Sequence, residues 1–274
     1  MHALIRKIMR KLIKTFRYFR ARARPKSALP FFWHVGSPNF GDDVNPAFFE
    51  KLSGKQIRYE KKRNRLHFLG MGSILGHANS QSTILGSGFI EPPSSKFNLP
   101  HKVVSVRGRL TQSYFQDMQN IYLGDPMVLV DSFISPEKSS DEIIGFVPHV
   151  SEAKKCASMD LHGLKIIDPS LSPMRVIHEI GTCSRIFSQS LHGLIVADAF
   201  KIPNIWVAPS PNMKGNDFKF KDYFSTMDSE KCPQPFEIEK MKNTAKNEFF
   251  VSEYLFDKRE YREIIVEAMS KNKI

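Results

Sequence analysis

Short apolar stretches, polar turns and helical patterns follow one another in a repeated order through most of the chain. The clearest case is RIFSQSLHGLIVADAFKIPNIW at 185–206, which predicts a strand at 185–187, a polar turn at 188–190 and a helix at 191–200. Apolar residues recur in this helix at spacings of three and four, and another strand is expected at 205–207. Strand, turn, helix and strand in this order form half of a doubly wound α/β unit.

The same pattern extends over the rest of the chain. It predicts strands at 31–35, 65–69, 83–85, 102–106, 121–123, 142–147 and 164–167, and helices at 46–52, 110–118, 172–180 and 252–270. A segment rich in Ser and Pro at 132–140 is expected to link two domains. We therefore expect an α/β fold divided into an N-terminal Rossmann-like lobe at 29–137, a C-terminal Rossmann-like lobe at 138–250 and a final helix within 251–274.

The turn at 188–190 is the strongest candidate for a ligand site. In doubly wound folds such a turn opens onto the ligand crevice, and the free N–H groups and dipole of the next helix favour an anion there. His192 adds a titratable side chain on the first helical turn, and Gly193 would let a ligand approach the backbone. The alternative is a capped helix with a surface histidine.

Polar residues and glycines follow several other predicted strands. Asn39, Gly41 and Asp42 follow the first strand, where the alternative is a plain turn with Asp43 as a helix N-cap. Glycine-rich loops at 70–73 and 86–88 suggest backbone close to a ligand or to a neighbouring loop.

Two charged residues also stand at strand ends. Arg107 comes directly after a β-branched strand, and its planar guanidinium suits a carboxylate or phosphate. Asp125 follows the next strand, either as a capping acid or as a crevice carboxylate.

Residues 1–28 differ from the rest of the chain in charge. Ten Lys and Arg residues lie at 6–26, and no acid precedes Asp42, so that the net charge of +12 belongs mainly to this segment. The apolar residues between them recur at helical spacing: Leu4, Ile5, Ile8, Met9, Leu12, Ile13, Phe16 and Phe19. This basic amphipathic helix is expected to bind an anionic membrane surface through residues 1–20, in preference to packing on the protein body or binding nucleic acid.

Composition and motifs narrow the classes of function. Hydrophobic content of 41% and charged content of 25% are ordinary for a globular protein, and no apolar run is long enough for a transmembrane helix. The three cysteines are scattered without metal-ligand spacing, which favours free thiols in a reducing compartment. Neither a dinucleotide-binding GxGxxG motif with its acid nor a P-loop occurs, so nicotinamide and ATP sites are poorly supported.

Taken together, these loop motifs resemble the polysaccharide pyruvyl transferase family, most closely its short branch of exopolysaccharide ketal-pyruvate transferases. The matching segments lie within residues 30–225: 39–43, 72–73, 86–88, 106–108, 124–126, 147–149, 190–193 with 202–203, and 218–219 with 222–223. The resemblance implies two lobes like those of GT-B glycosyltransferases and phosphoenolpyruvate as donor substrate. No cofactor or metal is expected, because the sequence shows no metal-ligand cluster. The resemblance also implies a lipid-linked sugar as acceptor, at the cytoplasmic face of the bacterial inner membrane.

The resemblance also suggests roles for individual residues. Many family members carry arginine at the position of Ser190, so a cation must come from Arg107, Lys219 or His149. His192 or His149 would then protonate the donor, and Asp42 or Asp125 would accept a hydroxyl proton. The residues expected to bind substrate are Arg107, Ser190, Leu191, Gly193, Asn39, Gly41, Ser87 and Lys219.

Two other functions fit parts of the pattern. A sugar-nucleotide glycosyltransferase of GT-B architecture would bind a nucleotide diphosphate at the same helix N-terminus. A non-catalytic basic module that binds a membrane or nucleic acid would explain the N-terminal charge, but not the strand-end loops in both halves of the chain.

Overall fold

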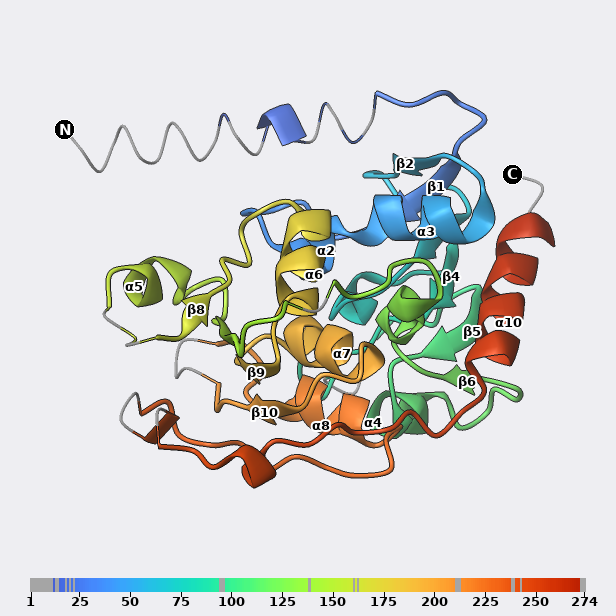
Figure 1. Ribbon diagram of the computed structural model, residues 1–274. Coiled ribbons are helices and arrows are strands. Elements are labelled where there is room, and N and C mark those ends of the chain that lie inside the picture. The colour runs from blue at the N-terminus through green and yellow to red at the C-terminus, as the bar shows by residue number, and fades with distance from the viewer. Residues whose placement is uncertain are drawn as a thin grey trace.

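The computed structural model describes residues 12, 15–17, 19, 21, 23–93, 97–137, 139–159, 161, 163–209, 213–237, 240–241 and 243–271. Within them the strands form two parallel sheets (Figure 1). The first sheet has the order β2-β1-β3-β4-β5-β6 and the second has the order β10-β9-β7-β8. The α/β class and the parallel sheets predicted from the sequence are confirmed.

The six-stranded sheet is built entirely from the first half of the chain. Its strands are β1 (Leu29–Phe32), β2 (Ile57–Tyr59), β3 (His67–Leu69), β4 (Ser82–Leu85), β5 (Lys102–Val106) and β6 (Tyr122–Leu123). The connecting helices are α2 (Phe40–Asp43), α3 (Asn45–Ser53) and α4 (Arg109–Gln112), with 3₁₀ turns η1 (Leu75–His77), η2 (Ser113–Phe115) and η3 (Pro126–Ser132). The single helix predicted at 110–118 is thus divided between α4 and η2, where the Ser113 hydroxyl donates to the Leu110 carbonyl.

The four-stranded sheet uses the second half of the chain. Its strands are β7 (Ile144–Val147), β8 (Lys165–Ile166), β9 (Arg185–Ser188) and β10 (Asn204–Trp206). The helices are α5 (Ala153–Ala157), α6 (Pro173–Gly181), α7 (Leu191–Ala199) and α8 (Phe218–Phe224), followed by the 3₁₀ turn η4 (Lys246–Glu248). Helix α7 is buried around almost its whole circumference, because it packs both on its own sheet and on η3 of the first half.

One hydrophobic core joins the two sheets. Phe31 and Phe68 from the first sheet belong to the same buried cluster as Leu194 of α7 and Trp206 of β10. A smaller cluster around Phe146 covers the other part of the second sheet. The two sheets therefore share a packed junction, which fixes the loops that meet there.

The C-terminal helix α10 (Lys258–Lys271) returns to the first half of the chain and packs against α3, β5 and η3 (Figure 1). It begins later than the predicted residue 252. The Asp257 carboxylate accepts the N–H groups of Arg259 and Glu260, so it acts as the N-cap. The preceding residues are extended, with an antiparallel bridge between Tyr254 and Met227.

Most of the amphipathic helix predicted for residues 1–28 lies outside the described residues. Three members of its apolar stripe are described, and Leu12, Phe16 and Phe19 are 58%, 67% and 71% exposed. Arg17 donates to the Gly36 carbonyl at 2.9 Å and pairs with Asp43. Within the described part of the chain, every helix is too short or too polar to cross a membrane.

Candidate functional site

A cavity of about 390 Å³ lies where the strand-end loops of both sheets meet. Segments after β1, β3 and β4 contribute one wall, and those after β7, β9 and β10 contribute another. The residues that line it are His34, Asn39, Asp42, Gly72, Ser73, Ile74, His77, Ile90, His149, Val150, Ser190, Leu191, His192, Lys214 and Lys219. Its position at the carboxyl ends of parallel strands is the usual ligand crevice of such folds.

The first turn of α7 forms part of the cavity wall. Ser190 is the N-cap residue, and Ser190, Leu191 and His192 all line the cavity. The first N–H groups of a helix have no partner within the helix, and its dipole favours an anion. Gly193 serves packing instead, because a Cβ atom there would come within 2.4 Å of Ser188 Oγ.

His192 lies between the two halves of the molecule. Its Nε2 atom is 3.6 Å from Oδ2 of Asp125, which is completely buried at the start of η3. Neither atom has a hydrogen-bond partner among the described residues. On the other side of the ring, a Cβ atom on Gly41 would come within 2.2 Å of His192 Nδ1, so only glycine leaves room for the imidazole.

Of the two roles that the sequence left open for Asp125, the structure shows the capping acid. Its Oδ1 atom accepts the N–H of Met127 at 3.0 Å and caps η3, while Oδ2 faces His192. Asp125 does not line the cavity, so its carboxylate reaches a substrate only through the imidazole.

The loop after β1 brings Asp42 to the cavity wall. Asn39, which also lines the cavity, donates from Nδ2 to Asp42 Oδ2 at 2.9 Å. Asp43 is not the N-cap considered from the sequence, because it ends α2 and its Oδ2 accepts the backbone N–H of Asn39. Burial raises the pKa of Asp43, an effect partly offset by that N–H and by Arg17.

Two basic side chains of the second half face the same cavity. Burial, and then the charge of Arg107, lowers the pKa of Lys219 to about 8, and Asp42 opposes the shift. Lys219 is therefore mostly charged at neutral pH. Burial and the charge of Lys219 lower the pKa of His149 to about 4, so this imidazole is neutral at pH 7.

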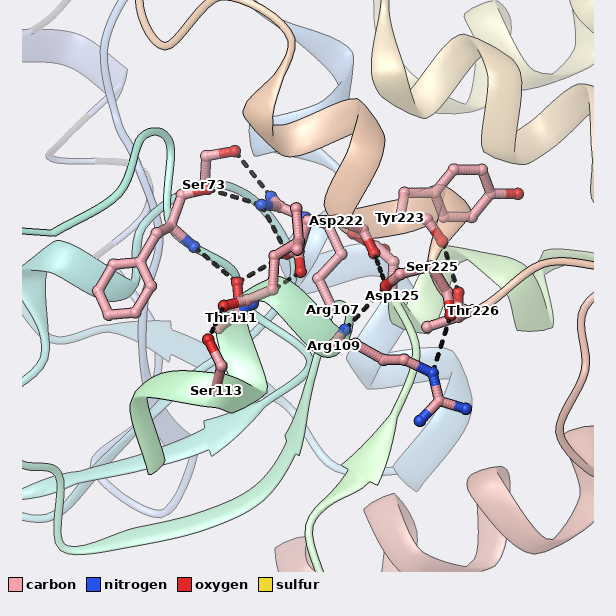
Figure 2. A network of polar contacts seen from close by, with 12 residues as sticks. Ser73, Arg107, Arg109, Thr111, Ser113, Asp125, Asp222, Tyr223, Ser225 and Thr226 are labelled. Carbon is pink, nitrogen blue, oxygen red and sulfur yellow. Dashed lines mark hydrogen bonds and ion pairs between the residues drawn. The ribbon is translucent and has the colours of Figure 1, made fainter. Parts of the chain in front are cut away.

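Arg107 lies behind the cavity wall rather than on it. Its side chain is completely buried and donates to Ser73 Oγ at 2.9 Å, to the Phe89 carbonyl at 2.6 Å and to Asp222 Oδ2 at 2.9 Å (Figure 2). Asp222 also accepts the N–H and hydroxyl of Thr111. The guanidinium thus joins Ser73 of the cavity wall to α8, the helix that carries Lys219.

The structure separates the predicted site residues into two groups. Those that line the cavity are Asn39, Asp42, His149, Ser190, Leu191, His192 and Lys219. Those that support the wall are Gly41, Ser87, Arg107, Asp125 and Gly193. Ser87, for instance, is completely buried and donates its hydroxyl to the Gly70 carbonyl.

Several cavity residues carried no role in the sequence interpretation. His34, His77 and Lys214 are the polar examples, together with Ser73. Ser73 belonged to a recognised motif at a strand end. His34 was placed inside the strand predicted at 31–35, whereas β1 ends at Phe32 and leaves His34 in the loop that follows. No group of His, Cys, Asp or Glu side chains within the described residues is arranged to hold a metal ion.

Comparison with known proteins supplies an independent line of evidence. Residues 34–211 match the family model described as polysaccharide pyruvyl transferase. The chain is 32% identical over 211 residues to the succinoglycan biosynthesis protein ExoV of Rhizobium meliloti. The matched region covers 72% of this chain and 64% of that protein. It is 28% identical over 215 residues to an uncharacterized protein of Acanthamoeba polyphaga mimivirus, over 73% of this chain and 74% of that one.

The chain thus spans slightly less than two thirds of the length of the rhizobial relative. No solved structure matches the chain.

Proposed function

Because the chain belongs to the polysaccharide pyruvyl transferase family, we propose that it transfers the pyruvate group of phosphoenolpyruvate to a saccharide and forms a ketal. The observation that carries this proposal is the convergence of Lys219, the first turn of α7 and His192 on one cavity. A donor with both a phosphate and a carboxylate requires several hydrogen-bond donors and a cation, and this cavity wall supplies them.

The reaction needs only proton transfers from the protein. Two hydroxyls of the saccharide add to the enol carbon, and the bond from that carbon to the phosphate oxygen breaks. Of the two hydroxyl protons, one ends on the methylene carbon, which becomes a methyl group, and one leaves with the phosphate. A positioned acid and base are sufficient for such a reaction.

His192 is the best-placed group for these transfers. It lines the cavity, and the carboxylate of Asp125 faces its Nε2 atom from the buried side. An N–H at Nε2 directed to Asp125 leaves Nδ1 as the atom that exchanges a proton with the substrate. We assign Asp42 as the second proton acceptor, because its carboxylate lines the same cavity and is oriented by Asn39.

Lys219 takes the place of the family arginine absent at Ser190. Its cation faces the cavity from α8, and Arg107 fixes that helix through Asp222. In this assignment Lys219 contacts the donor anion, whereas Arg107 is a positioning residue. His149 is neutral at pH 7 and contributes a hydrogen-bonding group rather than a charge.

Donor binding and turnover test the proposal. We expect calorimetry to detect binding of phosphoenolpyruvate and not of UDP-glucose, and phosphate release when a polysaccharide repeat unit is added. His192→Ala should lower kcat by about 10²–10⁴-fold. Lys219→Ala should weaken donor binding by at least about tenfold. Lys221→Ala is the matched control, since Lys221 lies on the same helix and pairs with Asp217 at the surface.

The outcome also separates the two classes of transferase. Tight binding of UDP-glucose without binding of phosphoenolpyruvate would favour a sugar-nucleotide glycosyltransferase. Mass spectrometry of the repeat unit before and after the reaction should show the mass increment of one pyruvate ketal.

The acceptor in this proposal is lipid-linked, and the enzyme acts at the cytoplasmic face of the inner membrane. Support comes from Phe16 and Phe19, whose rings are mostly exposed within a strongly basic segment. Phe16→Glu with Phe19→Glu should prevent flotation with vesicles containing anionic lipid, whereas Leu255→Glu, also at an exposed site, should not. If the wild type, the double variant and Leu255→Glu all float equally, the proposed membrane binding through this segment is wrong.

A further inference from the structure

The cavity is also lined by a second group of basic side chains besides Lys219 and His192. His34, His77 and Lys214 form this group, and Arg63 lies behind His77. The three lining residues come from the loop after β1, from η1 and from the loop before α8. Asp42 is the acidic residue among the described cavity-lining residues, and Lys214 pairs at 3.4 Å with Glu91, which is half exposed.

Packing fixes the positions of the two imidazoles. The His77 ring lies 5.3 Å from that of Phe32, centroid to centroid, and the Arg63 guanidinium lies 5.0 Å from the same Phe32 centroid. Arg63 also donates from Nη1 to the His77 carbonyl, while its Nε atom is buried without a partner among the described residues. A Cβ atom on Gly36 would come within 2.3 Å of His34 Nε2, so the His34 ring lies directly against this glycine.

Different charges act on the two groups of basic side chains. Burial lowers the pKa of His77, and Arg63, His34 and Lys214 lower it further. The groups that act on Lys219 are instead Arg107 and Asp42. The cavity therefore contains two groups of basic side chains, and a donor as small as phosphoenolpyruvate can occupy one and leave the other open.

We propose that His34, His77 and Lys214, with Arg63 behind them, form a subsite for an oxyanion, phosphate or carboxylate, carried by the saccharide acceptor. This inference rests on the proposed function, because it takes the Lys219 group as the donor site. An oxyanion here would pair with the Lys214 cation and accept hydrogen bonds from the two imidazoles. A neutral sugar would leave the Lys214 cation without an anionic partner on the ligand. The acceptor class is therefore an acidic saccharide or one bearing a phosphate or diphosphate.

Binding in the presence of the donor tests the subsite. The full chain is saturated with phosphoenolpyruvate and titrated calorimetrically with pyrophosphate, with glucuronate and with glucose. We expect pyrophosphate or glucuronate to bind and glucose not to bind. Pyrophosphate binding alone would indicate a diphosphate-linked acceptor, and glucuronate binding alone would indicate an acidic sugar.

Variants then assign the binding to these side chains. His77→Gln and Lys214→Ala should each weaken binding of the second anion by about tenfold while donor affinity stays unchanged. His178→Gln is the matched control, because His178 lies exposed on α6, and thermal melting checks that each variant is folded. Binding of the second anion that is independent of His77 and Lys214, or equal binding of glucose, would overturn the proposal.

The design separates this inference from the proposed function. If phosphoenolpyruvate fails to bind but pyrophosphate binding depends on His77, the donor assignment is wrong and the anion subsite stands. If phosphoenolpyruvate binds and no second anion follows, the subsite is wrong and the donor assignment stands.

Discussion

Two buried carboxylates join the halves of this molecule, and they differ in how completely they are paired. Asp222 on α8 accepts hydrogen bonds from Arg107 Nε, from the Thr111 backbone and from the Thr111 hydroxyl. Asp125 on η3 accepts one, from the Met127 backbone, and its second oxygen faces His192 at 3.6 Å. Both side chains are completely buried.

This difference suggests a structural role for Asp222 and a catalytic role for Asp125. A buried charge whose hydrogen bonds are all satisfied is a rigid attachment, whereas a buried polar atom without a partner requires an explanation. At Asp125 the explanation we offer is catalytic: the free oxygen is available to the imidazole when that ring gains a proton. In this proposal the Asp222 network holds the cavity wall, and the Asp125 contact acts during the reaction.

The largest effect is expected from breaking the buried Arg107–Asp222 ion pair. Arg107→Met leaves Asp222 buried without its cation, so the free energy of unfolding should fall by about 3–5 kcal/mol. Adding Asp222→Leu removes the unpaired charge, and the double variant should recover part of this loss. Urea denaturation measures both. A change below about 1 kcal/mol for Arg107→Met would mean that the pair does not hold the halves together.

The next effect is expected at the unsatisfied carboxylate. Asp125→Asn keeps an oxygen that can cap η3, so stability should change by less than about 1 kcal/mol. The charge that faces His192 is lost, and kcat should fall by at least about tenfold with KM for the donor little changed.

The split between kcat and KM is a readout that a purely structural role would not give. Wild-type kcat in Asp125→Asn would place this residue with the supporting group.

The sequence predicted well several of the strands and helices that carry this site. The strand at 102–106 agrees with β5 in both bounds, and the helix predicted at 172–180 agrees with α6 to within one residue at each end. Such segments have a strong local pattern and clear flanking signals. Because parallel strands bring their carboxyl ends to one edge, polar residues after those strands could be expected to meet.

The side-chain roles were harder to predict, because they depend on contacts between distant segments. Arg107 at a strand end has the same local sequence whether it faces a ligand or an aspartate 115 residues later. The sequence analysis also did not predict helix α8. The buried face of this helix carries aromatic rings together with the paired Asp222, so the sequence shows no clear apolar stripe. Only the assembled fold reveals which charges are already paired.

The smallest effect is expected at Lys219, which lines the cavity. Its pKa is lowered to about 8, so the charged form that would bind the donor anion is lost as pH rises through that value. Donor affinity should be constant near pH 7 and about tenfold weaker at pH 9, because one proton is lost per site. The donor phosphate ionises near pH 6, below this window.

Lys219→Arg should hold donor affinity constant to pH 9, since a guanidinium stays charged, and Lys221→Arg should behave as wild type. Calorimetric titration at several pH values measures this. If wild type and Lys219→Arg lose donor affinity in parallel as pH rises, the titrating cation is another group. Lys219 would then have a structural role, like Arg107.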